Sequence, residues 1–191
     1  MEEDLDMTEH PDAGSARKVL DFWFSSAVEA HWFDSDPEID RQITEQFSDL
    51  YQYAYDGELS DWMKDAESAL ALVILLDQFP RNMFRGSPRA FASDHMAREV
   101  SRAAIDNAFD QQRSARERAF FYLPLMHSED LLDQTECVQL YRRLQDDNSL
   151  DFAIRHHDII ARFGRFPHRN QVMGRESSED EREFLKTHKG F

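Results

Sequence analysis

The sequence predicts an all-α protein folded as a single domain. Apolar residues recur at helical spacing through most of the chain, and no stretch shows the alternation of a half-buried strand. Six glycines and six prolines in 191 residues are too few for the many turns of a β architecture. That length suits one sizeable core better than two. We expect seven or eight antiparallel helices in one domain over residues 15–188, preceded by an acidic tail over residues 1–14.

The first half of the chain contains two helices with clear signals. Asp36 followed by Pro37 is typical of a helix start, because aspartate caps the first turn and proline fits the first helical position. Apolar residues then recur at helical spacing before a stop at Gly57: Ile39, Ile43, Phe47, Leu50 and Ala54. Residues 66–79 are apolar on almost all sides, so we expect this helix at the centre of the domain. Pro80 should end it, because proline disfavours helical geometry in the preceding residue.

The second half is divided by further capping residues. Ser93 is expected to begin a helix that reaches about residue 110. Ser114 and Glu117 form a capping box for a shorter helix that should end near Pro124. The remaining helices are expected to start at Ser128, at Ser149, and at a second capping box made by Ser178 and Glu181, with the first two ending near residues 146 and 162.

The charge and the cysteine content limit the partners and the location. The formal net charge is -16, from 38 acidic and 22 basic residues. Such a field repels nucleic acids and anionic membranes, so we expect neither as a partner. The single Cys137 allows no internal disulfide, and no secretory leader opens the chain. The longest apolar run, residues 69–76, is too short to cross a bilayer. We therefore expect a soluble cytoplasmic protein.

Two similar motifs follow two of the expected helices. They read Phe-Pro-Arg-Asn at residues 79–82 and Phe-Pro-His-Arg-Asn at residues 166–170, and the stretches 81–89 and 162–175 are rich in arginine without a single acid. Guanidinium groups make charge-assisted, often bidentate, bonds to carboxylates and phosphates. We predict that the two loops meet in one cleft that binds an anionic small molecule or an acidic peptide segment. The binding residues would be Arg81, Asn82, Arg85, Arg165, His168, Arg169 and Asn170. The competing interpretation is that these arginines only neutralise the acids of the domain itself.

Three polar residues in or near apolar surroundings are weaker candidates for catalysis. Asp77 lies on an otherwise apolar helix, where an unpaired charge would cost several kcal/mol, so it needs a partner. The candidate partners are Arg81, Arg165 and Arg169. His156 lies in an apolar stripe typical of a core histidine, whereas His168 lies in the second basic loop, where it can change its charge near neutral pH.

These residues leave two alternatives to a binding module. One is a hydrolase or transferase for a phosphate or carboxylate substrate, with His156 or His168 as acid and base and Asp77 orienting it. The other is a structural or oligomeric interaction protein, which would show a large apolar surface patch. A homo-oligomer is left open.

Other chemistries have weaker support. The histidines and acids at 127–130 and 156–158 lack the spacing of known metal sites, and no phosphate-binding loop or nucleophile elbow occurs. Cys137 has no adjacent base. We therefore predict no metal and no cofactor. The aromatic residues at 22–24 and 32–33 are expected to pack in the core, with a groove for a partner segment as the alternative.

Several of these blocks together resemble one family. The segments are residues 20–24, 32–33, 75–86, 89–94, 121–130 and 155–174. In this order they are similar to the bacterial domain of unknown function 924 family, over roughly residues 17–188. The resemblance implies a single all-helical domain with a tetratricopeptide-like α-α superhelix. It implies no activity and no catalytic residues.

Overall fold

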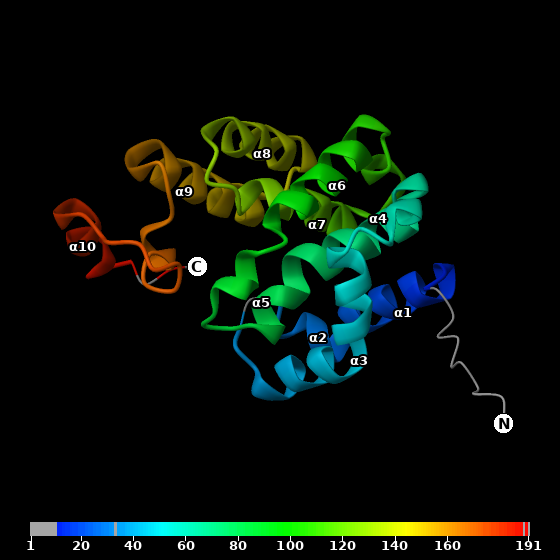
Figure 1. Ribbon diagram of the computed structural model, residues 1–191. Coiled ribbons are helices and arrows are strands. Elements are labelled where there is room, and N and C mark those ends of the chain that lie inside the picture. The colour runs from blue at the N-terminus through cyan, green and yellow to red at the C-terminus, as the bar shows by residue number, and fades with distance from the viewer. Residues whose placement is uncertain (1–10, 33, 189, 191) are drawn as a thin grey trace, which may run out of the picture.

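A computed structural model describes residues 11–32, 34–188 and 190, and over these residues the protein is all-α, without strands (Figure 1). The predicted fold class is confirmed. Short 3-10 turns connect several of the helices. In chain order the helices are α1 Ala13–Trp23, α2 Ser26–Glu29, α3 Pro37–Tyr55, α4 Ala66–Val73, α5 Phe79–Met83, α6 Asp94–Asp106, α7 Ala115–Met126, α8 Leu131–Leu144, α9 Asp147–Phe163 and α10 Glu179–Leu185.

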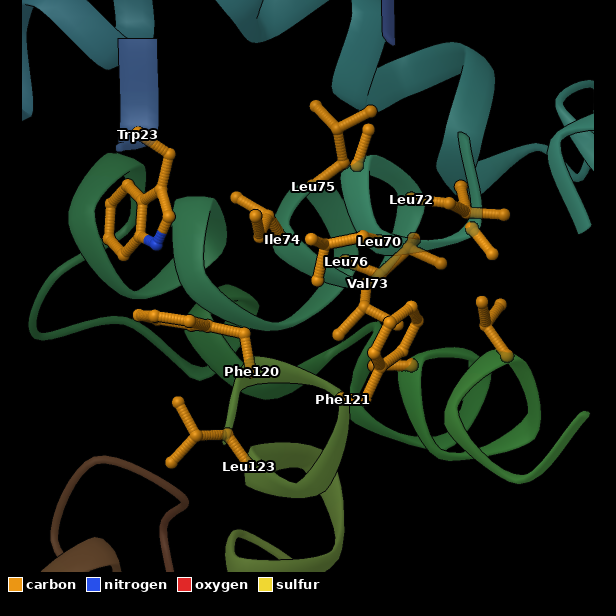
Figure 2. Packing of buried hydrophobic residues seen from close by; sticks show 14 of the residues in the cluster. Trp23, Leu70, Leu72, Val73, Ile74, Leu75, Leu76, Phe120, Phe121 and Leu123 are labelled. Carbon is orange, nitrogen blue, oxygen red and sulfur yellow. The ribbon is translucent and has the colours of Figure 1, made fainter. Parts of the chain in front are cut away.

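One helix over residues 66–83 forms the centre of the core. It consists of α4, a π turn over Ile74–Gln78, and α5, with no break between them. Helices α1, α6 and α7 pack against α4, while α3 packs against α5. Figure 2 shows side chains of α4 and the π turn pointing to several sides of the helix, with Trp23 and Phe120 close together on one of them. The rings of Trp23 and Phe120 meet edge to face, with centroids 5.9 Å apart.

Most of the predicted helix starts are confirmed, and two are wrong by a few residues. Asp36 caps α3, and both predicted capping boxes are formed. Helix α8 is capped by Asp130 instead of Ser128. Helix α9 begins before Ser149, because Asp146 accepts a hydrogen bond from the Ser149 backbone N–H at 3.1 Å. At the start of α9, the capping Asp146 lies three residues before the predicted Ser149. Aspartate and serine both cap helices, so the residue type alone did not decide between them.

The prediction that Pro80 ends its helix is wrong. The preceding residue, Phe79, has helical dihedral angles, and α5 continues to Met83. Proline has no N–H, so the carbonyl four residues before it, that of Leu76, loses its helical partner. The hydroxyl of Ser93 donates to this carbonyl at 2.7 Å, from outside the helix. A side chain from a distant segment thus satisfies the group that Pro80 leaves unpaired.

The second internal proline, Pro124, also lies inside its helix and does not stop it at once. Helix α7 passes through Pro124 and ends at Met126, beyond the predicted end. Near this proline, the Ser101 hydroxyl donates to the Phe121 carbonyl. The stop at Gly57 is confirmed, since α3 ends at Tyr55 and Gly57 adopts a φ of 79°.

The N-terminal helix α1 belongs to the core, because it packs against α4. Helix α1 begins at Ala13, so helical structure starts just before the end of the tail predicted at residues 1–14; residues 1–10 of that tail lie outside the described residues. In the predicted aromatic cluster, Trp23 is buried. Phe33 lies outside the described residues. No helix in the described part of the chain is both long and apolar enough to span a membrane.

Candidate functional site

The most unusual group in the core is the carboxylate of Asp77, which is completely buried in the π turn. Its oxygens lie 2.8 and 3.0 Å from Nδ1 of His127, at the end of α7. The side-chain amide of Gln78 also donates to it, and the Arg81 guanidinium lies 3.3 Å away. The predicted need for a partner is therefore met by Arg81, one of the three predicted candidates, and by a histidine. π turns inside helices occur often at functional sites.

The two arginine motifs meet next to this carboxylate, at Asp94. Arg81 from the first motif lies 3.0 Å from an Asp94 oxygen, and Arg169 from the second lies 3.6 Å from the other. The ring of Phe91 lies beside both guanidinium groups, 5.8 Å from that of Arg81 and 4.7 Å from that of Arg169. We call Asp77, Arg81, Asp94, His127 and Arg169 the Asp77 cluster.

Burial and charge together set the protonation states in this cluster. Burial disfavours the charged form of Asp77, but the charge of Arg81 and the hydrogen bonds from His127 and Gln78 outweigh it and lower the pKa to about 2. Burial, followed by the charge of Arg81, lowers the pKa of His127. The imidazole is therefore neutral at pH 7. A carboxylate only accepts hydrogen bonds, so Nδ1 carries the proton and Nε2 keeps its lone pair.

Arg169 is the least compensated charge of the cluster. Its side chain is 9% exposed, and it lies over the Phe166 ring at 4.5 Å. Its guanidinium donates to the backbone carbonyl of His127 at 3.0 Å, whereas its Nε is buried without a hydrogen-bond partner among the described residues. Burial and the nearby charge of Arg81 lower its pKa to about 10. A buried cation in this state is expensive for the fold.

The other predicted arginines and asparagines pair elsewhere. Arg85 and Asn82 both donate to Asp40 on α3, each at 2.8 Å. Arg165 forms a bidentate pair with Glu181 on α10, at 2.6 and 2.8 Å. These contacts agree with the interpretation in which arginines neutralise internal acids, and a role of these residues in ligand binding stays a prediction.

The remaining predicted residues lie in the second basic loop or behind it. Asn170 is buried and donates to Ser177 at 3.1 Å. His156 is buried against Phe166 and shares a hydrogen bond of 2.8 Å with the Phe152 carbonyl; burial lowers its pKa to about 3. His168 lies next to the same ring, and burial lowers its pKa to about 4. Neither histidine contacts Asp77, so the predicted pairing of one of them with this carboxylate is not seen.

His127 and Asp94 are the residues that sequence reasoning did not select. His127 lies 50 residues from Asp77, just after α7, where no helical spacing relates the two positions. Asp94 follows an expected capping serine, so it suggested only a helix start. No group of three or more His, Cys, Asp or Glu side chains could hold a metal ion within residues 11–32, 34–188 and 190.

Comparison with known proteins agrees with the resemblance seen in the sequence. The chain matches the family described as "Bacterial protein of unknown function (DUF924)" over residues 19–189. The chain belongs to this DUF924 family. A solved structure, that of the protein of unknown function ATU0120 from Agrobacterium tumefaciens, is similar, with 42% sequence identity and a TM-score of 0.88. The similarity covers 92% of this chain and 99% of that one. No curated protein matches the chain. The DUF924 fold is thus confirmed, and the chemistry must be argued from the cluster.

Proposed function

We propose that this domain binds an anionic small molecule or an acidic peptide segment at the Asp77 cluster. The guanidinium groups of Arg81 and Arg169 would bind its negative charge. The observation that carries this proposal is the under-compensated guanidinium of Arg169. Arg81 is within 3.3 Å of both carboxylates of the cluster, whereas Arg169 reaches only one of them, at 3.6 Å. A bound anion would supply the missing partner.

Two side chains of the cluster are partly exposed. The side chain of Arg81 is 21% exposed and that of His127 is 17% exposed, while Asp77 lies behind them, fully buried. An anion that binds the cluster would reach it through the exposed parts of these two side chains. The His127 ring is neutral because burial lowers its pKa, so the charge that attracts the anion comes from the arginines. The buried Asp77 fixes the orientation of both side chains.

A thermal-shift titration with inorganic phosphate and with citrate tests the proposal. A ligand that binds only the native state stabilises it by about 2.7 kcal/mol at a hundredfold excess over its Kd. Arg169→Met should remove this shift without destabilising the unliganded domain much, because a buried charge is exchanged for an apolar chain. Arg85→Met is the matched control, since Arg85 belongs to the first loop but pairs with Asp40. Stabilisation that survives Arg169→Met would contradict the proposal.

The Asp77–His127 pair favours catalysis as a second candidate function. Asp77 holds Nδ1–H, so Nε2 of His127 can act as a general base. In a hydrolysis, water would give its proton to Nε2 while its oxygen attacks the substrate, and the resulting imidazolium would return the proton to the leaving group. Arg81 and Arg169 would hold the anionic part of the substrate. In this catalytic alternative Asp77 remains the orienting residue, as predicted. His127 takes the acid-base role that was predicted for His156 or His168.

Turnover of nitrophenyl acetate and nitrophenyl phosphate tests this second candidate. His127→Gln removes the base but keeps a side chain that can donate to Asp77, so binding of citrate should persist while turnover is lost. His157→Gln is a control on α9, because this histidine contacts only its neighbour Asp158 among the pairs seen in the structure. Equal turnover by wild type and His127→Gln would exclude His127 as a catalytic residue.

A further inference from the structure

A second site lies in a cavity that does not include the Asp77 cluster. The cavity has a volume of about 290 Å³ and lies where α6, α7 and α8 come together. Its walls include Ile105 near the C-terminal end of α6, Arg118 on α7, and Arg143 on α8. This volume is at the lower limit of small-molecule pockets, so a ligand would have only a few carbon atoms.

Two arginines in this cavity have no carboxylate partner. Among the described residues, neither Arg118 nor Arg143 forms an ion pair, although the chain has 38 acidic residues. Arg118 is fixed by backbone carbonyls instead, since it donates to those of Asp110 at 3.1 Å and Arg113 at 3.5 Å. Arg143 is exposed, and its side chain forms no hydrogen bond within the described part of the chain. The guanidinium of Arg118 is thus held in place by the backbone, whereas that of Arg143 is not held by another group of the described residues.

The one acid of the cavity is already occupied. The carboxylate of Asp110, which is 1% exposed, accepts hydrogen bonds from the Tyr122 hydroxyl at 2.7 Å and from the Gln111 amide at 2.6 Å. Burial and this carboxylate raise the pKa of Tyr122, while the charges of Arg118 and Arg143 act in the opposite direction. The hydroxyl therefore remains a donor to Asp110. With two arginines and one aspartate, the walls have one positive charge in excess.

The remaining wall is apolar. It is formed by Ile105, Leu140 and Leu144, with Ala108 between α6 and the following turn. Ala108 adopts a φ of 54°, a left-handed conformation that is uncommon for a residue with a side chain. The chain therefore accepts a small local cost at a position that shapes this cavity. A ligand that fits the walls has one negative charge and a short hydrocarbon part.

We propose that this cavity binds a small aliphatic monocarboxylate, whose carboxylate pairs with Arg118 and Arg143 while its hydrocarbon chain packs against Ile105, Leu140 and Leu144. The single excess charge favours a monoanion over the dianionic form of phosphate. The proposal does not depend on the Asp77 cluster, which shares none of these residues.

Isovalerate is a suitable probe, and heteronuclear NMR of the full chain a suitable assay. We expect saturable shifts of the amide signals of Gln111 and Leu144. Arg143→Met should weaken binding by up to about fivefold, because an exposed charge-assisted hydrogen bond is lost. Arg142→Met is the matched control: Arg142 is the adjacent exposed arginine on α8, and it does not line the cavity. Arg142→Met and Arg169→Met should both bind isovalerate as the wild type does.

Four outcomes would overturn the proposal. Absence of saturable shifts at these amides excludes the site. Equal weakening by Arg142→Met and Arg143→Met means that only the general surface charge attracts the probe. Equal binding of isoamyl alcohol shows that the carboxylate is not recognised. Displacement of isovalerate by inorganic phosphate at equal concentration shows an inorganic-anion site instead.

Discussion

Replacing Asp77 by asparagine should lower the free energy of unfolding by about 2–4 kcal/mol at pH 7. Removing one partner of a buried ion pair typically costs about 3–5 kcal/mol, because the remaining charge is left uncompensated. Here the remaining charge is that of Arg81, which keeps Asp94 at 3.0 Å, so the expected loss lies around and somewhat below the lower end of this range. The asparagine can still accept the Nδ1–H of His127. Urea denaturation followed by tryptophan fluorescence measures this loss.

The same variant gives a pH signature. The pKa of Asp77 is lowered to about 2 in the fold, against 3.8 for an unperturbed aspartate. Its ionisation therefore stabilises the fold fully above pH 3.8, and this contribution is lost as the pH falls toward 2. The lost contribution is on the order of 2 kcal/mol. The difference between wild type and Asp77→Asn should be constant near neutral pH and shrink below about pH 4, in line with this linkage.

Asp40→Asn is the control for this experiment. Asp40 also pairs with an arginine, but its side chain is 20% exposed and that of Arg85 is 45% exposed. An exposed ion pair contributes about 0–1 kcal/mol, so this variant should lose little stability. Equal losses for Asp40→Asn and Asp77→Asn would refute the reasoning, because burial would then have no influence on the value of the pair.

Three further predictions concern other buried polar groups. Ser93→Ala should destabilise the domain by about 1–3 kcal/mol in urea denaturation, because the Leu76 carbonyl is left without its donor; no loss would show that water replaces the hydroxyl. The pKa of His156 is about 3 in the fold, so only the unfolded chain takes up a proton between pH 6.5 and 3. The free energy of unfolding should therefore fall as the pH drops over this range, by up to about 1.4 kcal/mol per pH unit. His156→Gln should show a smaller loss of this free energy between pH 7.5 and 5.5. Cys137 is fully buried and burial raises its pKa, so iodoacetamide should label it only after addition of denaturant, as detected by mass spectrometry.

Local signals in the sequence were enough for the helices. Asp36 with Pro37, the two capping boxes and Gly57 act on their own backbone neighbours, so their effect can be predicted without knowing the fold. Pro80 shows the limit of prediction from local signals. Its missing N–H is a local fact, but the hydroxyl that replaces it comes from Ser93, which tertiary packing brings to Leu76. The predicted helix end was wrong for this reason.

Part of the Asp77 cluster was predicted from the sequence. The sequence indicated that Asp77 needs a partner, and that two arginine loops have similar chemistry, because an acid in an apolar helix and arginines without acids are visible in the residue order. The sequence did not indicate that Arg81 and Arg169 would share Asp94 while Arg85 and Arg165 turn to Asp40 and Glu181.

The sequence by itself determined the helical class, most of the caps, and the presence of a carboxylate that has to be neutralised inside the core. Only the tertiary structure decided which groups compensate its charge. Asp77 and His127 are 50 residues apart, and their contact depends on how the central helix packs against α7. Ion pairs act over a few ångströms in space, whereas sequence periodicity reports only which face of a helix is buried.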